Sequence, residues 1–329
     1  MKTVAGALAL GLTLAAAPVL AAGFPVSLDN SFGTTTVAAQ PKRVVSIGYV
    51  EQDFLYALGI APVAVRNWWG DHPYATWPWA EAARQAVGAE PAVFNGDELN
   101  LEWVLDQNPD LIVGTFIEMD QAQYDALSRI APVVALPKGY PTWGAPWQDE
   151  LRAIDLATSG STEKSDRIVA DIEARFARVK ADYPQFAGRT ATNVYYDDGV
   201  FHLYDEEDSA SRFLVSLGLS FPPEFRGQGD EESNRITVSP ENLRTLDLDA
   251  VVWPIDAGSD TQKLVEAMPL YRNLRLAREG RSVWLDDGQG TMSGALSFQT
   301  PLSIAWLLDK LPPMLAAALD GDPATKVAP

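Results

Sequence analysis

One short segment of the chain concentrates aromatic side chains that could bind a bulky ligand. Its sequence, RNWWGDHPYATWPWAEAA, holds four tryptophans and one tyrosine. Aromatic rings offer large, flat apolar surfaces on which such a ligand can stack. Arg66, Trp68 and Trp69 follow a predicted strand, and neighbouring residues at a strand end point to opposite faces. At least one of the Trp68 and Trp69 rings could therefore line a cleft, or both could fill the core. Trp77 and Trp79 are expected to pack inside the lobe.

Comparable side chains stand near the ends of other predicted strands. These positions matter because ligands of parallel α/β sheets bind beyond the carboxyl ends of the strands. The first half of the chain contributes Tyr49, Phe94, Asn95 and Phe116, and the second half contributes Tyr196, Arg226 and Trp253, with Arg212 and Arg235 in reserve. We predict that these residues contact a ligand.

Several of these candidates have an alternative role that the sequence leaves open. Tyr196 and Trp253 end apolar strands, where each ring could equally be buried in the core. Arg226 lies in a polar connection long enough to form a binding loop. Its guanidinium could instead form a surface ion pair with Glu224 or Asp230, which we slightly favour.

The sequence offers little for catalysis or for direct metal binding. It contains no cysteine and only two histidines, His72 and His202. A catalytic nucleophile with its base, or a zinc or manganese site, usually draws on such residues. The sequence also contains neither a Gly-x-Ser-x-Gly motif nor a phosphate-binding loop. A secreted hydrolase is therefore the weaker alternative, and we expect no resident cofactor or metal.

Composition and charge indicate a globular protein that does not bind nucleic acid. The chain has 329 residues, of which 47% are hydrophobic, enough for one large domain or two ordinary ones. Lys and Arg total 25 against 44 Asp and Glu, so the formal net charge is −19. Such a charge repels nucleic acid and anionic lipid. An anionic ligand would need a local cluster of arginines.

The amino-terminal residues indicate export from the cytoplasm. Residues 1–21 combine Lys2, an apolar run and a small-residue site that ends at Ala21, which is typical of a cleaved signal peptide. Because the chain has no cysteine, we expect neither disulfides nor a lipid-modified cysteine. We expect a free periplasmic protein that is a monomer.

The order of elements predicts two α/β lobes with mainly parallel sheets. Short apolar strands alternate with helices on both sides of STEKSDRIVADIEARFARVKADY, residues 161–183. Ser161 is a suitable N-cap, and Ile168, Ile172, Phe176 and Val179 form one apolar stripe, so this segment is expected to be a single long helix. We predict lobes over residues 22–160 and 184–329, joined by this helix, with a ligand cleft between them.

The motifs in their order resemble a known family. PKRVVSIG with DFLYALGI, NLEWVLDQNPDLIVG and YDALSRIAPVV in the first half, and TVSPENLRTLDLDAVV with PLYRNLRLAREGRSVWLD in the second, resemble the siderophore-type (class III) substrate-binding proteins of ABC importers. The resemblance covers about residues 41–319. It implies two Rossmann-like lobes joined by one helix, a ferric siderophore held between them and delivery to an ABC permease. Haem or cobalamin is the alternative ligand in this fold.

The same resemblance assigns a docking role to two glutamates. In the family, one glutamate on the rim of each lobe pairs with arginines of the permease. The matching positions here are Glu102, in NLE, and Glu241, in VSPE. Each is expected to begin a helix, where a carboxylate is also favoured by the helix dipole alone.

Overall fold

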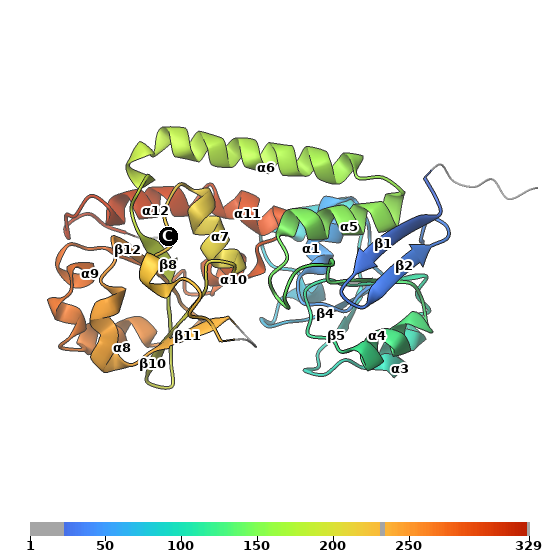
Figure 1. The fold of residues 1–329 in the computed structure, drawn as a ribbon, viewed down its shortest axis with the longest axis horizontal. Helices are drawn as coiled ribbons and strands as arrows, with labels where there is room; N and C mark the ends of the chain where they lie inside the picture. The colour runs from blue at the N-terminus through green and yellow to red at the C-terminus, as the bar shows by residue number, and fades with distance from the viewer. Residues whose placement is uncertain (1–22, 231–233, 328–329) are drawn as a thin grey trace, which may run out of the picture.

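The computed structural model describes residues 23–230 and 234–327, so the predicted signal peptide over residues 1–21 lies outside the described residues. Figure 1 shows two groups of strands and helices with the long helix α6 (Glu163–Asp182) running above both. The chain passes once between the groups at α6. The boundaries at residues 160 and 183 stay a prediction. Within the described part of the chain, no helix is both long and apolar enough to cross a membrane.

The first group is built around a parallel sheet of five strands. The strands are β3 (Val44–Ser46), β4 (Ala64–Arg66), β5 (Ala92–Phe94), β6 (Leu111–Gly114) and β7 (Val133–Ala135). Their order is β5-β4-β3-β6-β7. The three central strands and β7 are buried throughout, as short, continuously apolar strands of a covered parallel sheet should be. A hairpin of β1 (Val26–Asn30) and β2 (Gly33–Val37) precedes them.

Helices connect these strands. They are α1 (Glu51–Ala57), the 3-10 turn η1 (Pro73–Ala75), α2 (Glu81–Ala86), α3 (Leu101–Asp106), α4 (Gln121–Ser128) and α5 (Trp147–Ser159). The sequence analysis did not predict α5, which lies beside α6 and carries a buried face. Its last residues matter for α6, because the two helices are joined by a tight turn at Gly160 in the left-handed conformation.

The second group divides its strands between two sheets. A parallel sheet has the order β13-β12-β8, and an antiparallel sheet has the order β11-β10-β9. Their strands are β8 (Ala191–Asn193), β9 (Tyr195–Asp197), β10 (Val200–Tyr204), β11 (Arg235–Val238), β12 (Ala250–Pro254) and β13 (Ser282–Leu285). The sequence over residues 192–196 predicts one strand, but these residues belong to two strands that are interrupted at Val194. The predicted fold class, mixed α/β with parallel sheets and a long helix, is confirmed.

The helices of the second group are short. They are η2 (Pro184–Phe186), α7 (Ser209–Ser216), η3 (Pro223–Phe225), η4 (Pro240–Leu246), α8 (Thr261–Ala267), η5 (Tyr271–Asn273), α9 (Arg275–Arg278), α10 (Thr291–Phe298), α11 (Pro301–Leu307) and α12 (Leu311–Ala318). The sequence over residues 301–319 predicts one helix, which is wrong, because the segment forms two helices, α11 and α12. Pro312 and Pro313 lack the N–H that a continuous helix would use there.

The start of α6 is capped by a residue that the sequence analysis missed. Ser161 was the predicted N-cap, but the carboxylate of Asp155 accepts the N–H groups of Lys164 and Ser165 at 3.1 and 2.8 Å. The preceding helix therefore supplies the cap through space. Of the predicted apolar stripe, Ile172, Phe176 and Val179 are buried, Ile168 is half-buried, and Val169 joins them.

One aspartate in each group ties neighbouring parallel strands together at their amino ends. Asp110, just before β6, accepts the N–H groups of Lys42 and Arg43, just before β3. Asp249, just before β12, accepts the N–H of Thr190 before β8 at 3.0 Å. The paired motifs NPDLIV and LDLDAVV thus place the same carboxylate at the same point of two sheets.

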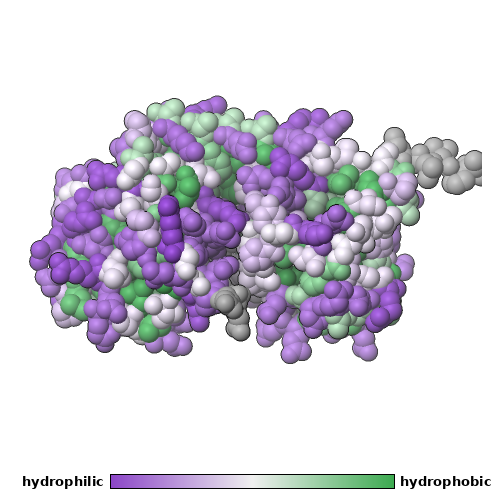
Figure 2. Space-filling model, viewed as in Figure 1, coloured by the Kyte–Doolittle hydropathy of each residue, from purple (hydrophilic) through white to green (hydrophobic). Residues whose placement is uncertain are grey.

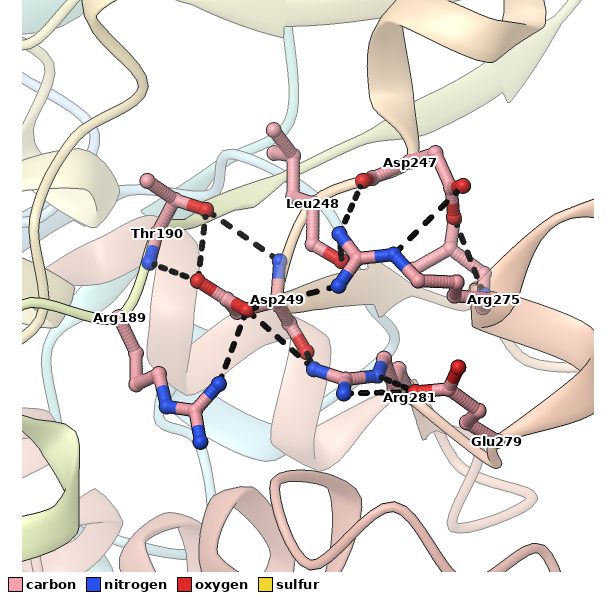
Figure 3. A network of polar contacts seen from close by, with 9 residues as sticks. Arg189, Thr190, Asp247, Leu248, Asp249, Arg275, Glu279 and Arg281 are labelled. Atoms are coloured by element: carbon pink, nitrogen blue, oxygen red, sulfur yellow. Dashed lines mark hydrogen bonds and ion pairs between the residues drawn. The ribbon is translucent and has the colours of Figure 1, made fainter.

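The second of these aspartates carries a larger network (Figure 3). Asp249 also accepts from Arg189 and Arg281, and Arg275 lies close by. Burial alone would raise the pKa of Asp249, but the hydrogen bonds from Thr190 and the charge of Arg189 hold it below its usual value. This network closes the amino end of the sheet, opposite the end at which ligands of such sheets bind.

Candidate ligand-binding site

A cavity of about 480 Å³ lies between the two groups, at the carboxyl ends of their parallel strands. Figure 2 shows a groove between the two halves and a mainly hydrophilic surface around it. The cavity is lined by Tyr49, Trp68, Trp69, Phe116, Trp143, Tyr195, Tyr204, Asp208, Ser209, Ala210, Asp256 and Ser297. Residues from both halves therefore share one site, and its size suits a ligand larger than an amino acid.

Five aromatic rings from the first half form one wall of this cavity, here called the aromatic wall: Tyr49, Trp68, Trp69, Phe116 and Trp143. The Tyr49 ring stacks on Trp68 at 5.2 Å and on Trp143 at 5.9 Å between ring centroids. Trp68 meets Trp69 edge to face at 4.2 Å, and Phe116 meets Trp143 at 4.8 Å. Because each ring contacts another, the wall is preformed and loses little freedom when a ligand stacks on it.

A buried carboxylate fixes the two loops that carry Tyr49 and Phe116. Glu51 is fully buried and accepts the N–H groups of Phe116 at 2.7 Å and Val50 at 3.1 Å. Burial raises the pKa of Glu51 to about 7, against the opposing effect of these donors. A side chain at Gly48 would collide with this carboxylate, which explains the glycine in the SIG motif. The buried acid thus positions the base of the aromatic wall.

Arg66 supports the wall from behind. Its guanidinium lies over the Tyr49 ring, 4.5 Å from the centroid, and the residue is only 3% exposed. The same group donates to the backbone carbonyls of Gly96 and Asp97. Because its donors are directed at these carbonyls, Arg66 holds the loop after β5 and the Tyr49 ring in fixed positions. It also lines an adjoining cavity of about 460 Å³, which includes Asn95.

The second half forms a different wall, here called the polar wall: Tyr195, Tyr204, Asp208, Asp256 and Ser297. The Tyr195 hydroxyl lies 3.4 Å from the Ser297 hydroxyl, and burial raises the pKa of Tyr195, so the phenol stays protonated. The Asp208 carboxylate caps α7 by accepting the N–H of Ala210 at 3.0 Å. Hydroxyls and carboxylates dominate this wall.

The two halves also meet beside the cavity, around Phe298 at the end of α10. The Phe298 ring lies within 5.2 to 5.8 Å of the rings of Trp68, Trp69, Trp77 and Trp79. A side chain at Gly294 would come within 3.0 Å of Trp77, so α10 packs its backbone directly against the tryptophans. The predicted packing of Trp77 and Trp79 is confirmed, since they are 3% and 8% exposed.

A buried hydrogen-bonded carboxylate joins the halves at the same place. Asp53 in α1 accepts from Trp79 Nε1 at 2.7 Å and from Thr300 Oγ1, at the start of α11, at 2.9 Å. Burial raises the pKa of Asp53 to about 7, although both donors favour its charged form. This contact links segments 247 residues apart in the sequence, and it fixes how the tryptophans lie relative to α11.

Four of the predicted ligand residues line the main cavity. Tyr49, Trp68, Trp69 and Phe116 are all in the aromatic wall, so both adjacent tryptophans face the cavity. Arg66 and Asn95 line the adjoining cavity. Their contact with a ligand stays a prediction.

The other four predicted ligand residues line neither the main cavity nor the adjoining one. Phe94 packs on Trp103, with centroids 5.1 Å apart, on the outer side of the sheet edge. Trp253 is fully buried in the core, stacked on Trp284, and donates to the Ser282 hydroxyl at 3.0 Å. The prediction that Trp253 faces the cleft is therefore wrong, because β12 is a central strand whose side chains are covered on both faces.

Tyr196 and Arg226 are also placed away from the main cavity. Tyr196 packs on Phe201 at 4.9 Å, and Arg226 forms an ion pair with Glu206 at 3.0 Å. The pairing of Arg226 in a surface ion pair was foreseen, but with Glu224 or Asp230 as its partner. Of the reserve arginines, Arg212 lines a neighbouring cavity and Arg235 is exposed on β11.

Trp143 and all five residues of the polar wall were not among the residues predicted from the sequence. Tyr195 was passed over for its neighbour Tyr196, although adjacent strand residues point to opposite faces and only one could face the cavity. The break at Val194 decides which one does. Trp143, with φ of 66°, and Ser297 come from a loop and a helix that were not predicted. No pattern in the sequence marks them.

The two glutamates predicted to dock a permease are exposed in separate halves. Glu102 lies in the first turn of α3, and Glu241 lies in the first turn of η4. Hydrogen bonds from its own backbone N–H and from the Ser239 side chain hold the pKa of Glu241 below its usual value. Both carboxylates therefore face solvent.

This architecture, two α/β halves with a lined cavity between them, is that of solute-binding proteins. Residues 44–287 match the periplasmic binding protein family, and the chain belongs to that family. A periplasmic solute-binding protein from Mycobacterium smegmatis has a solved structure that is 32% identical and aligns with a TM-score of 0.78, covering 90% of this chain and 99% of that chain. The family consists of extracytoplasmic substrate-binding transport proteins, not enzymes.

Two further similarities agree with the resemblance to siderophore-type proteins. The probable siderophore-binding lipoprotein YfiY of Bacillus subtilis is 26% identical over 282 residues, which cover 82% of this chain and 83% of YfiY. The structure of PiaA from Streptococcus pneumoniae, solved in complex with ferrichrome, aligns with a TM-score of 0.76 at 24% identity and covers 90% of this chain and 99% of that chain. The predicted resemblance is confirmed at the level of family and fold.

Proposed function

We propose that this protein captures a preformed ferric siderophore in the cavity between its halves and delivers it to an ABC permease. The observation that carries the proposal is the aromatic wall, in which five rings face one cavity. A ferric siderophore presents flat or apolar arms around an iron that is already fully coordinated. Such a ligand needs stacking surfaces and a few hydroxyl groups, rather than metal ligands from the protein.

The relatives support this assignment. YfiY is named a probable siderophore-binding lipoprotein, and PiaA carries ferrichrome in its structure. The iron in this proposal is cargo that arrives with the chelate, and the protein holds no cofactor of its own. Within residues 23–230 and 234–327, no three histidine, aspartate or glutamate side chains gather in a way that could hold a metal ion.

The proposal extends to location and partner. We place the protein in the periplasm as a monomer that is free of the membrane, and its partner in the inner membrane. Exposed Glu102 and Glu241 would each meet a basic group of the permease, one per half, and set the register of docking. YfiY is named a lipoprotein, whereas the 329 residues here contain no cysteine.

Fluorescence titration tests the ligand assignment. The purified protein is titrated with ferric hydroxamate, catecholate and carboxylate siderophores and with the iron-free form of each. Because Trp68, Trp69 and Trp143 line the cavity, a bound chelate should quench tryptophan emission with a Kd below about 1 µM. The proposal fails if no ferric siderophore quenches specifically. A new Soret band with added haemin would instead support haem as the ligand.

A further inference from the structure

Among the described residues, those that line the main cavity include carboxylates and no basic side chain. None of the twelve residues that line it is arginine, lysine or histidine. Two of them are carboxylates, Asp208 and Asp256. Asp256 is exposed at the end of β12 and also lines the neighbouring cavity of about 730 Å³, where Asp71 joins it. A ligand in this cavity therefore meets aromatic faces on one side and carboxylates on the other.

Two arginines near the cavity are already engaged, whereas Arg235, exposed on β11, lies opposite the cavity residue Tyr204 in the strand register. Arg66 is directed at two backbone carbonyls and lies beneath the Tyr49 ring. Arg226 pairs with Glu206. Neither presents a free guanidinium to the main cavity.

Arg212 is the strongest rival as an anion contact, and its surroundings exclude it in this conformation. It donates to the Gly144 carbonyl at 2.8 Å, and its other terminal nitrogen is covered by protein atoms and has no hydrogen-bond partner. Its charge acts on the carboxyls of Glu150 and Asp208 and lowers the pKa of each, although burial raises both. Arg212 thus compensates buried acids instead of attracting a ligand.

His72 adds no positive charge either. It lines the neighbouring cavity beside Trp77, with ring centroids 4.3 Å apart. Burial lowers its pKa, against the opposing effect of Asp71, so the imidazole is neutral at pH 7. The surroundings of the cavity are acidic on balance, in a chain whose formal net charge is −19.

These observations separate the siderophore classes by charge. Three hydroxamates, each a monoanion, neutralise Fe³⁺, whereas three catecholates, each a dianion, leave a strongly negative chelate. A negative chelate would meet carboxylates, and no described residue that lines the cavity is basic and could offset them. An ammonium arm, in contrast, is attracted both by carboxylates and by aromatic faces.

We infer that the cavity selects uncharged or cationic ferric chelates, of the trihydroxamate class, and rejects anionic tricatecholates. This inference rests on the proposed function, because it names the class of siderophore that the same cavity holds. Asp256 acts as the selecting group, and the aromatic wall supplies affinity that does not depend on charge.

A panel of three probes tests the inference. Ferrichrome is neutral, ferrioxamine B carries an ammonium arm, and ferric enterobactin is anionic. Their Kd values are measured by tryptophan quenching at low and at high salt. Ferrichrome and ferrioxamine B should bind at least about tenfold more tightly than ferric enterobactin at low salt, and the gap should narrow as salt screens the carboxylates.

The outcomes of this panel are distinct. Tightest binding of ferric enterobactin, or equal binding of all three, overturns the charge selection and leaves the proposed function standing. If none of the three chelates binds, the proposed function fails and the inference with it.

A matched pair of variants assigns the selection to a residue. Asp256→Asn should tighten the binding of ferric enterobactin about fivefold at low salt and weaken that of ferrioxamine B, with little change for ferrichrome. Asp171→Asn makes the same change of charge on the exposed side of α6, away from the cavity, and should alter none of the three. Equal effects of the two variants would show that only overall charge matters and would remove Asp256 from the selecting role.

Discussion

The two walls of the cavity are built from different chemistry, although both lie at the carboxyl ends of parallel strands. The aromatic wall is held ring against ring, with Arg66 behind it and the buried Glu51 at its base. The polar wall consists of hydroxyls and carboxylates from two sheets and two helices. The first wall offers a large surface that accepts many shapes, and the second offers directed groups that distinguish among them.

This difference separates affinity from selection. Stacking on preformed rings is favourable for any ligand with a flat or apolar arm, because the rings lose little freedom. Hydrogen bonds and charges discriminate more strongly, because an unmatched polar group loses its hydration without replacement. Changes in the aromatic wall should therefore weaken all ligands alike, and changes in the polar wall should reorder them.

The largest effect, a loss of permease-dependent uptake, is expected when the exposed glutamates of the two halves, Glu102 and Glu241, are changed. The double variant Glu102→Arg with Glu241→Arg should abolish permease-dependent uptake of the ferric siderophore, because each half loses the charge that sets its docking position. Each single variant should reduce uptake less. Binding of the chelate in solution should stay unchanged, as measured by fluorescence. Uptake that persists in the double variant would remove both residues from docking.

The aromatic wall is tested by removing one of its central rings. Trp68 contacts Tyr49, Trp69, Phe116 and Phe298, so Trp68→Ala should weaken every chelate about hundredfold, or about 3 kcal/mol. Trp103→Ala removes the same kind of ring outside the cavity, where it packs on Phe94, and should leave Kd unchanged. Thermal unfolding followed by circular dichroism checks that both variants fold. Selective loss of one chelate would contradict a wall that only supplies affinity.

The buried Asp53 carboxylate, which joins the two halves, should make the free energy of unfolding depend on pH. The pKa of Asp53 is near 7 in the folded protein and near 3.8 when unfolded. The folded state thus holds this proton more tightly, so the contribution of Asp53 to the free energy of unfolding is greatest below about pH 4 and falls as pH rises through 7. Between pH 5 and pH 7 this contribution falls by about 2 kcal/mol.

Asp53→Asn keeps an oxygen that can accept from Trp79 and Thr300 but cannot ionise. It should therefore remove the part of the decrease in the free energy of unfolding that Asp53 contributes. Glu51, with a pKa of about 7, would still contribute its own decrease in the free energy of unfolding. Urea unfolding at pH 5, 6 and 7 measures the change. Glu173→Gln on the exposed side of α6 is the control and should keep the wild-type slope. An unchanged slope in Asp53→Asn would mean that Asp53 does not titrate in this range.

The smallest effect is expected for a single hydroxyl of the polar wall. Tyr195→Phe keeps the ring and removes the group that lies near Ser297. It should weaken chelates whose outer oxygens reach this hydroxyl by about 1 kcal/mol, and spare the others. Kd values for the ferric siderophores that bind the wild-type protein measure this. A uniform loss for all of them would show that Tyr195 acts through packing, as the opposite wall does.

Some features were predictable because they depend on local patterns. The apolar strands Leu111–Gly114 and Val133–Ala135 and the long helix Glu163–Asp182 follow from runs of side chains with one spacing. The four aromatic residues that reached the main cavity were chosen because they follow strands. The motifs also placed the chain in its family, because several of them occur together in one order.

Other features were decided only in three dimensions. Trp253 and Trp68 both follow or end apolar strands, yet one is covered on both faces and the other faces the cavity. The difference depends on which strands flank β12 and where α10 packs, and neither is written in the local sequence.

The amino-acid sequence by itself determined the strands, the long helix, the absence of cysteine chemistry and the membership of the family, because these depend on composition and on short-range order. The tertiary structure alone decided which rings share a cavity, that Asp155 caps α6, that Thr300 donates to Asp53, and that Arg66 donates to backbone carbonyls. These are contacts between residues far apart in the chain, and their energies depend on burial and on partners that only the folded protein brings together.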